Sequence, residues 1–217
     1  MTKAEFEARN KQIVACGRCP RLVAWREEIG QIKRRSFEDW SYWAKPVPDF
    51  GNPNATRLIV GLAPAAHGAN RTGQMFTGDR SGDWLYRALH KAGVANISKA
   101  DSIEDGLKLT GVLISAACHC APPDNKPTPE ELSNCHGYLH EILQSRSWKS
   151  ILCLGSIAWS NVLKNLDEKR SPFSHLAIHN TKTGIKVVGS YHPSQQNTFT
   201  GKLTEPMLDA AVEEFLR

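Results

Sequence analysis

Short apolar runs alternate with amphipathic segments along most of the chain. Four runs end in loops rich in glycine, proline or small polar residues, a pattern that is typical of buried strands. They cover residues 57–62, 111–117, 150–154 and 186–191. Apolar residues at helical spacing follow each run. This alternation predicts an α/β fold, in which a three-layer α/β/α sandwich surrounds a central four-stranded, largely parallel sheet.

Local signals place the helices between these strands. Trp84, Leu85, Ala88, Leu89 and Ala92 share one face of a helix that begins near residue 80. The segment that starts at Thr128 is a capping box, with proline at the first helical position and glutamate at the third. A further helix is expected near 156–166. The last helix is expected to be capped by Thr204 and to place its apolar residues in the core, through Leu216.

The first 56 residues differ from the rest. Residues 1–30 are expected to be helical, with an interruption at Cys16–Pro20, while 31–56 combine aromatic residues and prolines. Such density predicts a long loop held by ring packing. We therefore predict one domain over residues 1–217, in which 1–56 is an N-terminal helical and loop region and 57–217 is the α/β core.

Composition narrows the class of protein. The chain has 217 residues, of which 41% are hydrophobic and 23% charged, so collagen-like, coiled-coil and disordered classes are excluded. No apolar run approaches the roughly 20 residues of a membrane span. The charged N-terminus lacks the apolar region of a signal peptide, which predicts a cytoplasmic protein. The net charge of +5 permits a polyanionic partner without establishing one.

Most of the unusual residues lie where predicted strands end. The loops at these points begin at Ala63, His119, Gly155 and His192. In parallel α/β sheets, ligands bind at the carboxyl ends of the strands. The sequence therefore predicts a functional site at this edge.

Six cysteines suggest a metal site, because a cytosolic chain of this size is not expected to depend on disulfides. Cys16 and Cys19 form a tight pair, whereas Cys120 and Cys135 lie on a loop and a helix. Four thiolates suit zinc or an iron–sulfur cluster, and the single tight pair favours a [4Fe–4S] cluster. Cys118 shares a face with Cys120, which is preferred because a loop follows it. Cys153 lies mid-strand and is expected in the core.

Five motifs, taken together, resemble one family. They are Cys16-Gly-Arg-Cys-Pro-Arg-Leu22, the stretch from Gly61 to Gly73, Met75-Phe-Thr-Gly-Asp79, Cys120-Ala-Pro-Pro-Asp-Asn-Lys-Pro127, and the stretch from His192 to Gly201. In this order the chain resembles the uracil-DNA glycosylase superfamily, and specifically its iron–sulfur family 5, from about residue 12 to the C-terminus. Neither a Walker A loop nor a dinucleotide-binding fingerprint is present.

The resemblance implies an activity and its cofactor. It implies a monomeric enzyme that flips uracil out of double-stranded DNA and hydrolyses the N-glycosidic bond, which leaves an abasic site. Other deaminated bases, such as hypoxanthine and xanthine, are implied as further substrates. The implied cofactor is a [4Fe–4S] cluster on Cys16, Cys19, Cys120 and Cys135. Cys118 and Cys153 match no ligand position.

The resemblance also assigns chemical roles. His192 matches a superfamily histidine that hydrogen-bonds the anionic leaving base, and Phe76 matches an aromatic residue that stacks on the flipped base. Ala63 stands where many relatives have a carboxylate or amide that holds water. We therefore rank Asn125 and Asn70 above His67 as groups that position the water. Asp79, the nearest carboxylate, is equally well explained as a helix N-cap.

Two loops complete the predicted site. The substrate-binding residues are predicted to be Gly61, Leu62, Ala63, Phe76, Ser194 and Asn197. DNA is expected to contact Arg71 and Lys202 through its phosphates, with Lys126 as a further candidate, and Phe199 as a wedge in the base stack.

Two other functions remain open from the residues alone. The first is a non-catalytic iron–sulfur protein that binds nucleic acid, which Ala63 permits because it removes the obvious catalytic group. The second is an electron-transfer protein, which is disfavoured because the cysteines are dispersed over a large α/β body with a separate pocket.

Overall fold

A computed structural model describes residues 1–217. Its six-stranded sheet has the order β1-β3-β2-β4-β6-β5. The four central strands are parallel and confirm the four predicted ones: β2 (Arg57–Gly61), β3 (Val112–Ala116), β4 (Ser150–Leu154) and β6 (Lys186–Ser190). Two short antiparallel strands, β1 (Phe50–Gly51) and β5 (Ile178–Asn180), extend the sheet at its edges. Neither contains an apolar run, so the hydrophobic pattern gave no sign of them.

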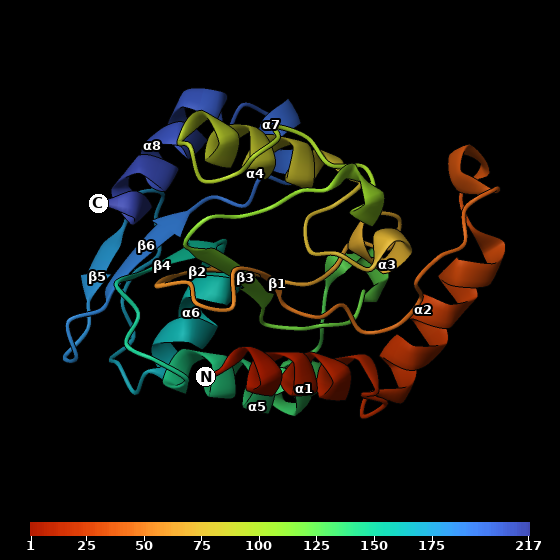
Figure 1. Cartoon of the computed structure of the whole chain (residues 1–217), viewed down its shortest axis with the longest axis horizontal. Coiled ribbons are helices and arrows are strands. Elements are labelled where there is room, and N and C mark those ends of the chain that lie inside the picture. Colours follow the sequence, from red (N-terminus) through yellow and green to blue (C-terminus); the bar gives the residue numbers. More distant parts are fainter.

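Helices cover both faces of the sheet (Figure 1). One face carries α4 (Arg80–Lys91) and α8 (Glu205–Leu216), and the other carries α1 (Lys3–Val14), α5 (Pro129–Gln144) and α6 (Ser156–Asn165). Alternate strand residues enter the two cores: Ile59 and Leu152 face α4 and α8, while Leu58 and Ile151 face α5 and α6. The predicted α/β/α sandwich is thus confirmed.

The remaining elements are short or lie at one side. Helix α2 (Pro20–Ile32) projects beside α3 (Ala69–Thr72), and α7 (Gln195–Phe199) follows β6. Single 3₁₀ turns cover Arg35–Phe37, Ile103–Asp105 and Pro123–Asn125. No helix is long and apolar enough to cross a membrane.

The helices begin at the capping residues that the sequence indicates. The Thr128 hydroxyl accepts a hydrogen bond from Glu131 N in a complete capping box. Asp79 caps α4 by accepting from Gly82 N at 3.0 Å. Thr204 is the N-cap residue of α8, as predicted, but its side chain makes no capping hydrogen bond.

The segment between α2 and β2 is held against the core, as its aromatic density predicts. Trp43 N and Ala44 N donate hydrogen bonds to Arg71 O and Asn70 O at 2.9 and 3.0 Å. Val47 N donates to His119 O at 2.7 Å. This segment is consequently fixed to the loops that leave β2 and β3.

Candidate functional site

A cavity of about 200 Å³ opens where β2, β4 and β6 end. Its lining combines apolar side chains with a few polar ones: Leu62, Leu154, Gly155, Ser156, Ile157, Phe173, Tyr191, His192, Asn197 and Lys202. An apolar cavity with few polar groups at the carboxyl edge of a parallel sheet is typical of a ligand site. The site therefore lies at the edge that the sequence predicts.

His192 supplies the imidazole of this cavity. Asn197 Nδ2 donates a hydrogen bond to His192 O at 2.8 Å and so fixes the loop that follows β6. Burial lowers the pKa of His192 to about 4, which keeps the imidazole neutral at pH 7. Since the hydrogen bond at this residue engages its backbone carbonyl, the ring remains available to a ligand in the cavity. A neutral imidazole can donate one hydrogen bond without a charge of its own.

Phe76 stacks on His192, with ring centroids 6.0 Å apart and planes inclined by 29°. Its backbone has a φ of 54°, an unusual value for an aromatic residue. Two glycines make room for it. A Cβ at Gly61 would lie 2.8 Å from Phe76 Cζ, and one at Gly82 would lie 1.7 Å from Phe76 O. Gly61 thus leaves space for the Phe76 ring, and Gly82 leaves space for the Phe76 backbone. No sequence motif identified Gly82.

Helix α7 presents polar and aromatic groups beside the cavity. The Ser194 hydroxyl caps this helix by accepting from Asn197 N at 3.4 Å. Phe199 is 69% exposed, which is unusual for an aromatic side chain in a folded protein and fits the predicted wedge. Lys202 Nζ lies 5.0 Å from the centre of the Tyr191 ring. These positions agree with a surface that faces a ligand outside the cavity.

Arg80 supports α7 from the neighbouring helix α4. Its Nε donates a hydrogen bond to Thr198 Oγ1 at 3.1 Å, and its guanidinium carbon lies 4.4 Å from the centre of the Phe199 ring. The sequence gave no indication of these contacts, because Arg80 and Thr198 are 118 positions apart along the chain.

None of the three candidates for positioning water lines the cavity. Asn70 is fully buried, and its Nδ2 donates to Arg26 O at 3.3 Å. His67 Nδ1 lies 3.0 Å from the Tyr42 hydroxyl. Asn125 is exposed in a tight turn with a φ of 56°. Of the three, only Asn125 has a solvent-exposed side chain, so it stays the preferred candidate.

Ala63 and Asp79 do not line the cavity, and each packs against another part of the protein. Ala63 packs against the cysteine cluster described below and offers no polar group, as its sequence implies. Asp79 packs against the glycine-rich loop, since a Cβ at Gly68 would lie 2.1 Å from Asp79 Oδ2. Burial raises the pKa of Asp79, although its hydrogen bonds to backbone amides oppose this effect.

The expected phosphate contact of Arg71 is wrong for this structure. Arg71 is 3% exposed, and its Nε and Nη2 donate to His67 O and Gly78 O, both at 2.9 Å. Its guanidinium carbon lies 3.9 Å from the Phe37 ring centre and 4.0 Å from that of Trp40. The guanidinium therefore holds loops together and does not face DNA.

Arg71→Ala is expected to lower the free energy of unfolding by about 2–3 kcal/mol, because a buried side chain loses its ring contacts and leaves carbonyl acceptors unpaired. Denaturant unfolding measures this effect. Lys126→Ala is the matched control, since Lys126 is exposed and its removal should change stability by less than about 0.5 kcal/mol. Equal stability of the two variants would show that the stack around Arg71 contributes nothing.

Five cysteines gather in one buried cluster between α2, α5 and the loop after β3. Its cysteines are Cys16, Cys19, Cys118, Cys120 and Cys135. None forms a disulfide. Cys153 lies fully buried in the core under α5 and α6, as predicted. No group of three or more His, Cys, Asp or Glu side chains is arranged so that it could hold a single metal ion.

Two polar side chains donate to the sulfur atoms of this cluster. Arg26 Nη1 lies 3.1 Å from Cys120 Sγ, and Asn134 Nδ2 lies 3.5 Å from Cys19 Sγ. Cys118 Sγ instead donates to the carbonyl of Cys120 at 3.5 Å. Cys118 and Cys120 therefore have different surroundings, although the sequence places them two residues apart.

A buried polar network fixes the chain just before Cys120. His119 Nδ1 lies 2.7 Å from Val47 O, and its Nε2 lies 3.9 Å from Asp49 Oδ1. Arg9, which is 5% exposed, forms an ion pair with Asp49. This network joins α1, the long loop and the end of β3, and it was not predicted from the sequence.

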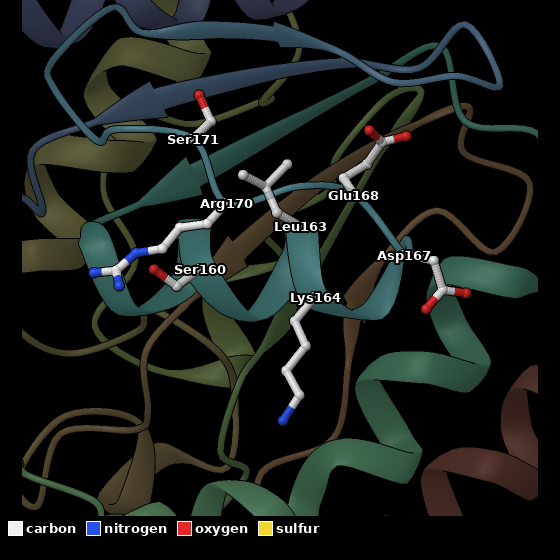
Figure 2. Close-up of a pocket in the computed structure, with 7 residues that line it drawn as sticks. All are labelled: Ser160, Leu163, Lys164, Asp167, Glu168, Arg170 and Ser171. Atoms are coloured by element: carbon white, nitrogen blue, oxygen red, sulfur yellow. The ribbon is translucent and has the colours of Figure 1, made fainter.

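A larger hollow, of about 640 Å³, lies elsewhere, along α6 and the loop that follows it. Figure 2 shows its seven lining residues: Ser160, Leu163, Lys164, Asp167, Glu168, Arg170 and Ser171. Their polar ends point in different directions and do not converge on one point. Its size is therefore not evidence of a ligand site.

Comparison with known proteins gives a consistent result. The family model for the uracil DNA glycosylase superfamily matches residues 48–216. A type-5 uracil-DNA glycosylase of Mycobacterium leprae is 50% identical over 205 residues, which cover 92% of this chain and 90% of that protein. The corresponding protein of Thermus thermophilus is 47% identical (93% and 92% covered), and that of Pyrobaculum aerophilum is 46% identical (89% and 84% covered).

Proposed function

The chain belongs to the uracil DNA glycosylase superfamily, and on this premise we propose that it removes uracil from double-stranded DNA in base excision repair. It hydrolyses the N-glycosidic bond and leaves an abasic site. The observation that carries the proposal is the neutral ring of His192, stacked on Phe76 at a cavity on the carboxyl edge of the sheet. The high identity to several type-5 uracil-DNA glycosylases supports the choice of uracil.

The proposed reaction begins with extrusion of the nucleotide. Flipping costs a few kcal/mol and costs least at a mismatch such as uracil opposite guanine. As the glycosidic bond breaks, the electron pair stays with the base, which leaves as an anion, and the sugar becomes cationic. The His192 N–H donates a hydrogen bond to an oxygen of the departing base and stabilises its developing charge. Water then adds to the sugar carbon and loses its proton to solvent.

The surroundings of His192 support this role. Asn197 holds the backbone of the loop, and Phe76 covers one face of the imidazole. The ring therefore keeps one orientation before the substrate binds, and no free energy is spent on orienting it during the reaction. Lys202 and Phe199 lie beside the cavity on the surface that would meet the duplex. We assign phosphate contact to Lys202 and base-stack insertion to Phe199.

Other deaminated bases are a finer part of the proposal. A purine such as hypoxanthine or xanthine also leaves as an anion when its glycosidic bond breaks. The hydrogen bond from His192 would stabilise that charge in the same way.

We propose that Cys16, Cys19, Cys120 and Cys135 hold a [4Fe–4S] cluster. Such a cluster binds its four cysteines through different iron atoms, so the ligands stand further apart than those of a single ion. Arg26 supports the assignment: it is 6% exposed, and its nearest carboxylate, on Glu27, is 3.9 Å away. A buried guanidinium needs an anion, and the Cys120 sulfur, 3.1 Å from Arg26 Nη1, would supply one once a metal displaces its proton. When bound, the cluster would cross-link α2, α5 and the loop after β3.

A duplex with one uracil opposite guanine tests the proposed function. Incubation with the purified protein, followed by alkaline cleavage of abasic sites, should give strand breaks only at the uracil. The same duplex with cytosine is the control. Tight binding of the uracil duplex without any strand break would favour the alternative, a nucleic-acid-binding protein without catalysis.

A further inference from the structure

The segment that follows α2 forms a projecting, positively charged arm, which we define as residues 32–45. Helix α2 and the turn after it extend away from the sheet on the side where α3 lies (Figure 1). Ile32 is 70% exposed, and it is followed by three consecutive cations, Lys33, Arg34 and Arg35. Both arginines are exposed. Nothing in the proposed mechanism uses them.

The cations of this arm are not neutralised within the protein. The ammonium group of Lys33 donates to the backbone carbonyl of Glu38 at 2.8 Å and does not pair with a carboxylate. Arg34 and Arg35 belong to no ion pair, whereas other arginines nearby, such as Arg21 and Arg26, do. Glu38 and Asp39 follow in the same arm, so its four cations, with Lys45, exceed the two acids. An unpaired cluster of exposed cations is a suitable contact for a polyanion.

The arm is held rigidly against the loop and short helix that follow β2. Phe37 and Trp40 of the arm lie on the guanidinium of Arg71, at 3.9 and 4.0 Å. The Tyr42 hydroxyl lies 3.0 Å from His67 Nδ1. Arg71 and His67 both belong to the loop and short helix that follow β2. A surface fixed to this loop has a defined position relative to the cavity, which a flexible basic tail would lack.

The arm and α7 lie at the carboxyl ends of two different strands of the sheet. The arm is attached to the loop and short helix that follow β2, whereas α7 and Lys202 follow β6. In the sheet, β4 separates β2 from β6. The cavity, which contains residues from the ends of β2, β4 and β6, therefore lies between the two basic surfaces.

We propose that this arm is a second DNA-binding surface, in which Lys33, Arg34 and Arg35 contact backbone phosphates of the duplex beside the flipped nucleotide. The proposal rests on the proposed function, because it takes the duplex around the lesion as the ligand. Phosphate contacts fix the position of a protein on DNA without reading its sequence. Contacts at two sides of the cavity would hold the duplex while one nucleotide is extruded.

The salt dependence of binding tests the proposal. The variant Lys33→Ala/Arg34→Ala/Arg35→Ala is compared with the parent protein on a duplex that carries an uncleavable abasic analogue. Each lost phosphate contact should reduce the slope of log K against log salt concentration by about 0.9. We expect the slope to decrease by about 1–3 and the affinity at low salt to fall at least about tenfold.

A matched control removes the same charge elsewhere. Lys108, Lys149 and Lys164 are exposed, and the first two precede β3 and β4, at the opposite edge of the sheet. Their triple alanine variant should keep the slope of the parent protein. The variant Lys33→Arg/Arg34→Lys/Arg35→Lys should also keep it, since it retains the charge. Thermal melting of each variant verifies that it is folded.

Two outcomes separate the arm from the proposed function. An unchanged slope in the arm variant, or an equal decrease in the control, would overturn the arm as a DNA contact even if the parent protein excises uracil. A decrease confined to the arm variant would support the arm even if the parent protein excises nothing. The duplex can also be shortened on one side of the abasic analogue at a time. Removal of the side that the arm contacts should abolish the difference in salt slope between the parent protein and the arm variant.

Discussion

His192→Ala is expected to lower single-turnover excision of uracil by roughly 10²–10³, or about 2.7–4 kcal/mol, which is the effect of removing one donor from a developing anion. The structure gives the reason. The ring is kept neutral by burial, is oriented by Phe76 and Asn197, and lies in the cavity at the end of β6. The charge that it stabilises exists only as the glycosidic bond breaks, so the loss should be in the rate of the chemical step.

Binding and pH dependence provide the controls for His192. Affinity for a duplex with an uncleavable abasic analogue should change little in His192→Ala, because that ligand has no leaving base. Since the pKa of His192 is lowered to about 4, its protonation should not reduce the parent rate between about pH 8 and about pH 5. Near-full excision by His192→Ala, together with weaker binding, would contradict the leaving-group role and make the residue a binding element.

The neighbouring polar residues form a comparison set for the same assay. Asn125→Ala should lower the rate with only a small loss of stability, because its side chain is exposed although its φ of 56° favours asparagine over alanine. Asn70→Ala should mainly destabilise the protein, since the buried amide of Asn70 joins α3 to Arg26 O. A loss of rate in a fully folded Asn70→Ala variant, with no loss in Asn125→Ala, would reverse our preference.

Cys120→Ala is expected to abolish the proposed cluster and to lower the free energy of unfolding by more than about 4 kcal/mol, a size characteristic of losing a metal centre. Iron content and the broad absorbance of the purified protein measure the first effect. The loss of Cys120 would also leave the exposed carboxylate of Glu27, 3.9 Å away, as the remaining anionic partner of the buried Arg26 guanidinium. One zinc and no iron in the parent protein would exclude the cluster without affecting the fold.

Cys118 and Cys153 are the matched controls for Cys120. Both are fully buried, so their replacement by alanine should cost only about 1 kcal/mol for a small cavity and should leave iron bound. The Cys118 sulfur donates a hydrogen bond to the carbonyl of Cys120, whereas the Cys120 sulfur accepts one from Arg26. We therefore expect Cys118 to remain a thiol. Iron loss in Cys118→Ala with iron retained in Cys120→Ala would show that the wrong cysteine was assigned.

The sequence alone determined the elements whose signals are local. Each central strand is a short apolar run, and Thr128 with Glu131 forms a capping box within four residues. Such patterns depend on the burial of neighbouring residues and on backbone donors one turn away, so they are visible without the fold. The order of strands and loops then placed His192 and the loop after β2 at one edge of the sheet.

Only the tertiary structure decided which side chains serve the site and which support it. The charge of Arg71 and its position in a motif predicted a phosphate contact. Its guanidinium instead contacts the rings of Phe37 and Trp40, which belong to a segment far away along the chain. Gly82 is required by the carbonyl of Phe76, and Arg80 braces α7 from another helix. Burial and pairing depend on contacts between segments far apart along the chain, and a one-dimensional pattern does not encode these contacts.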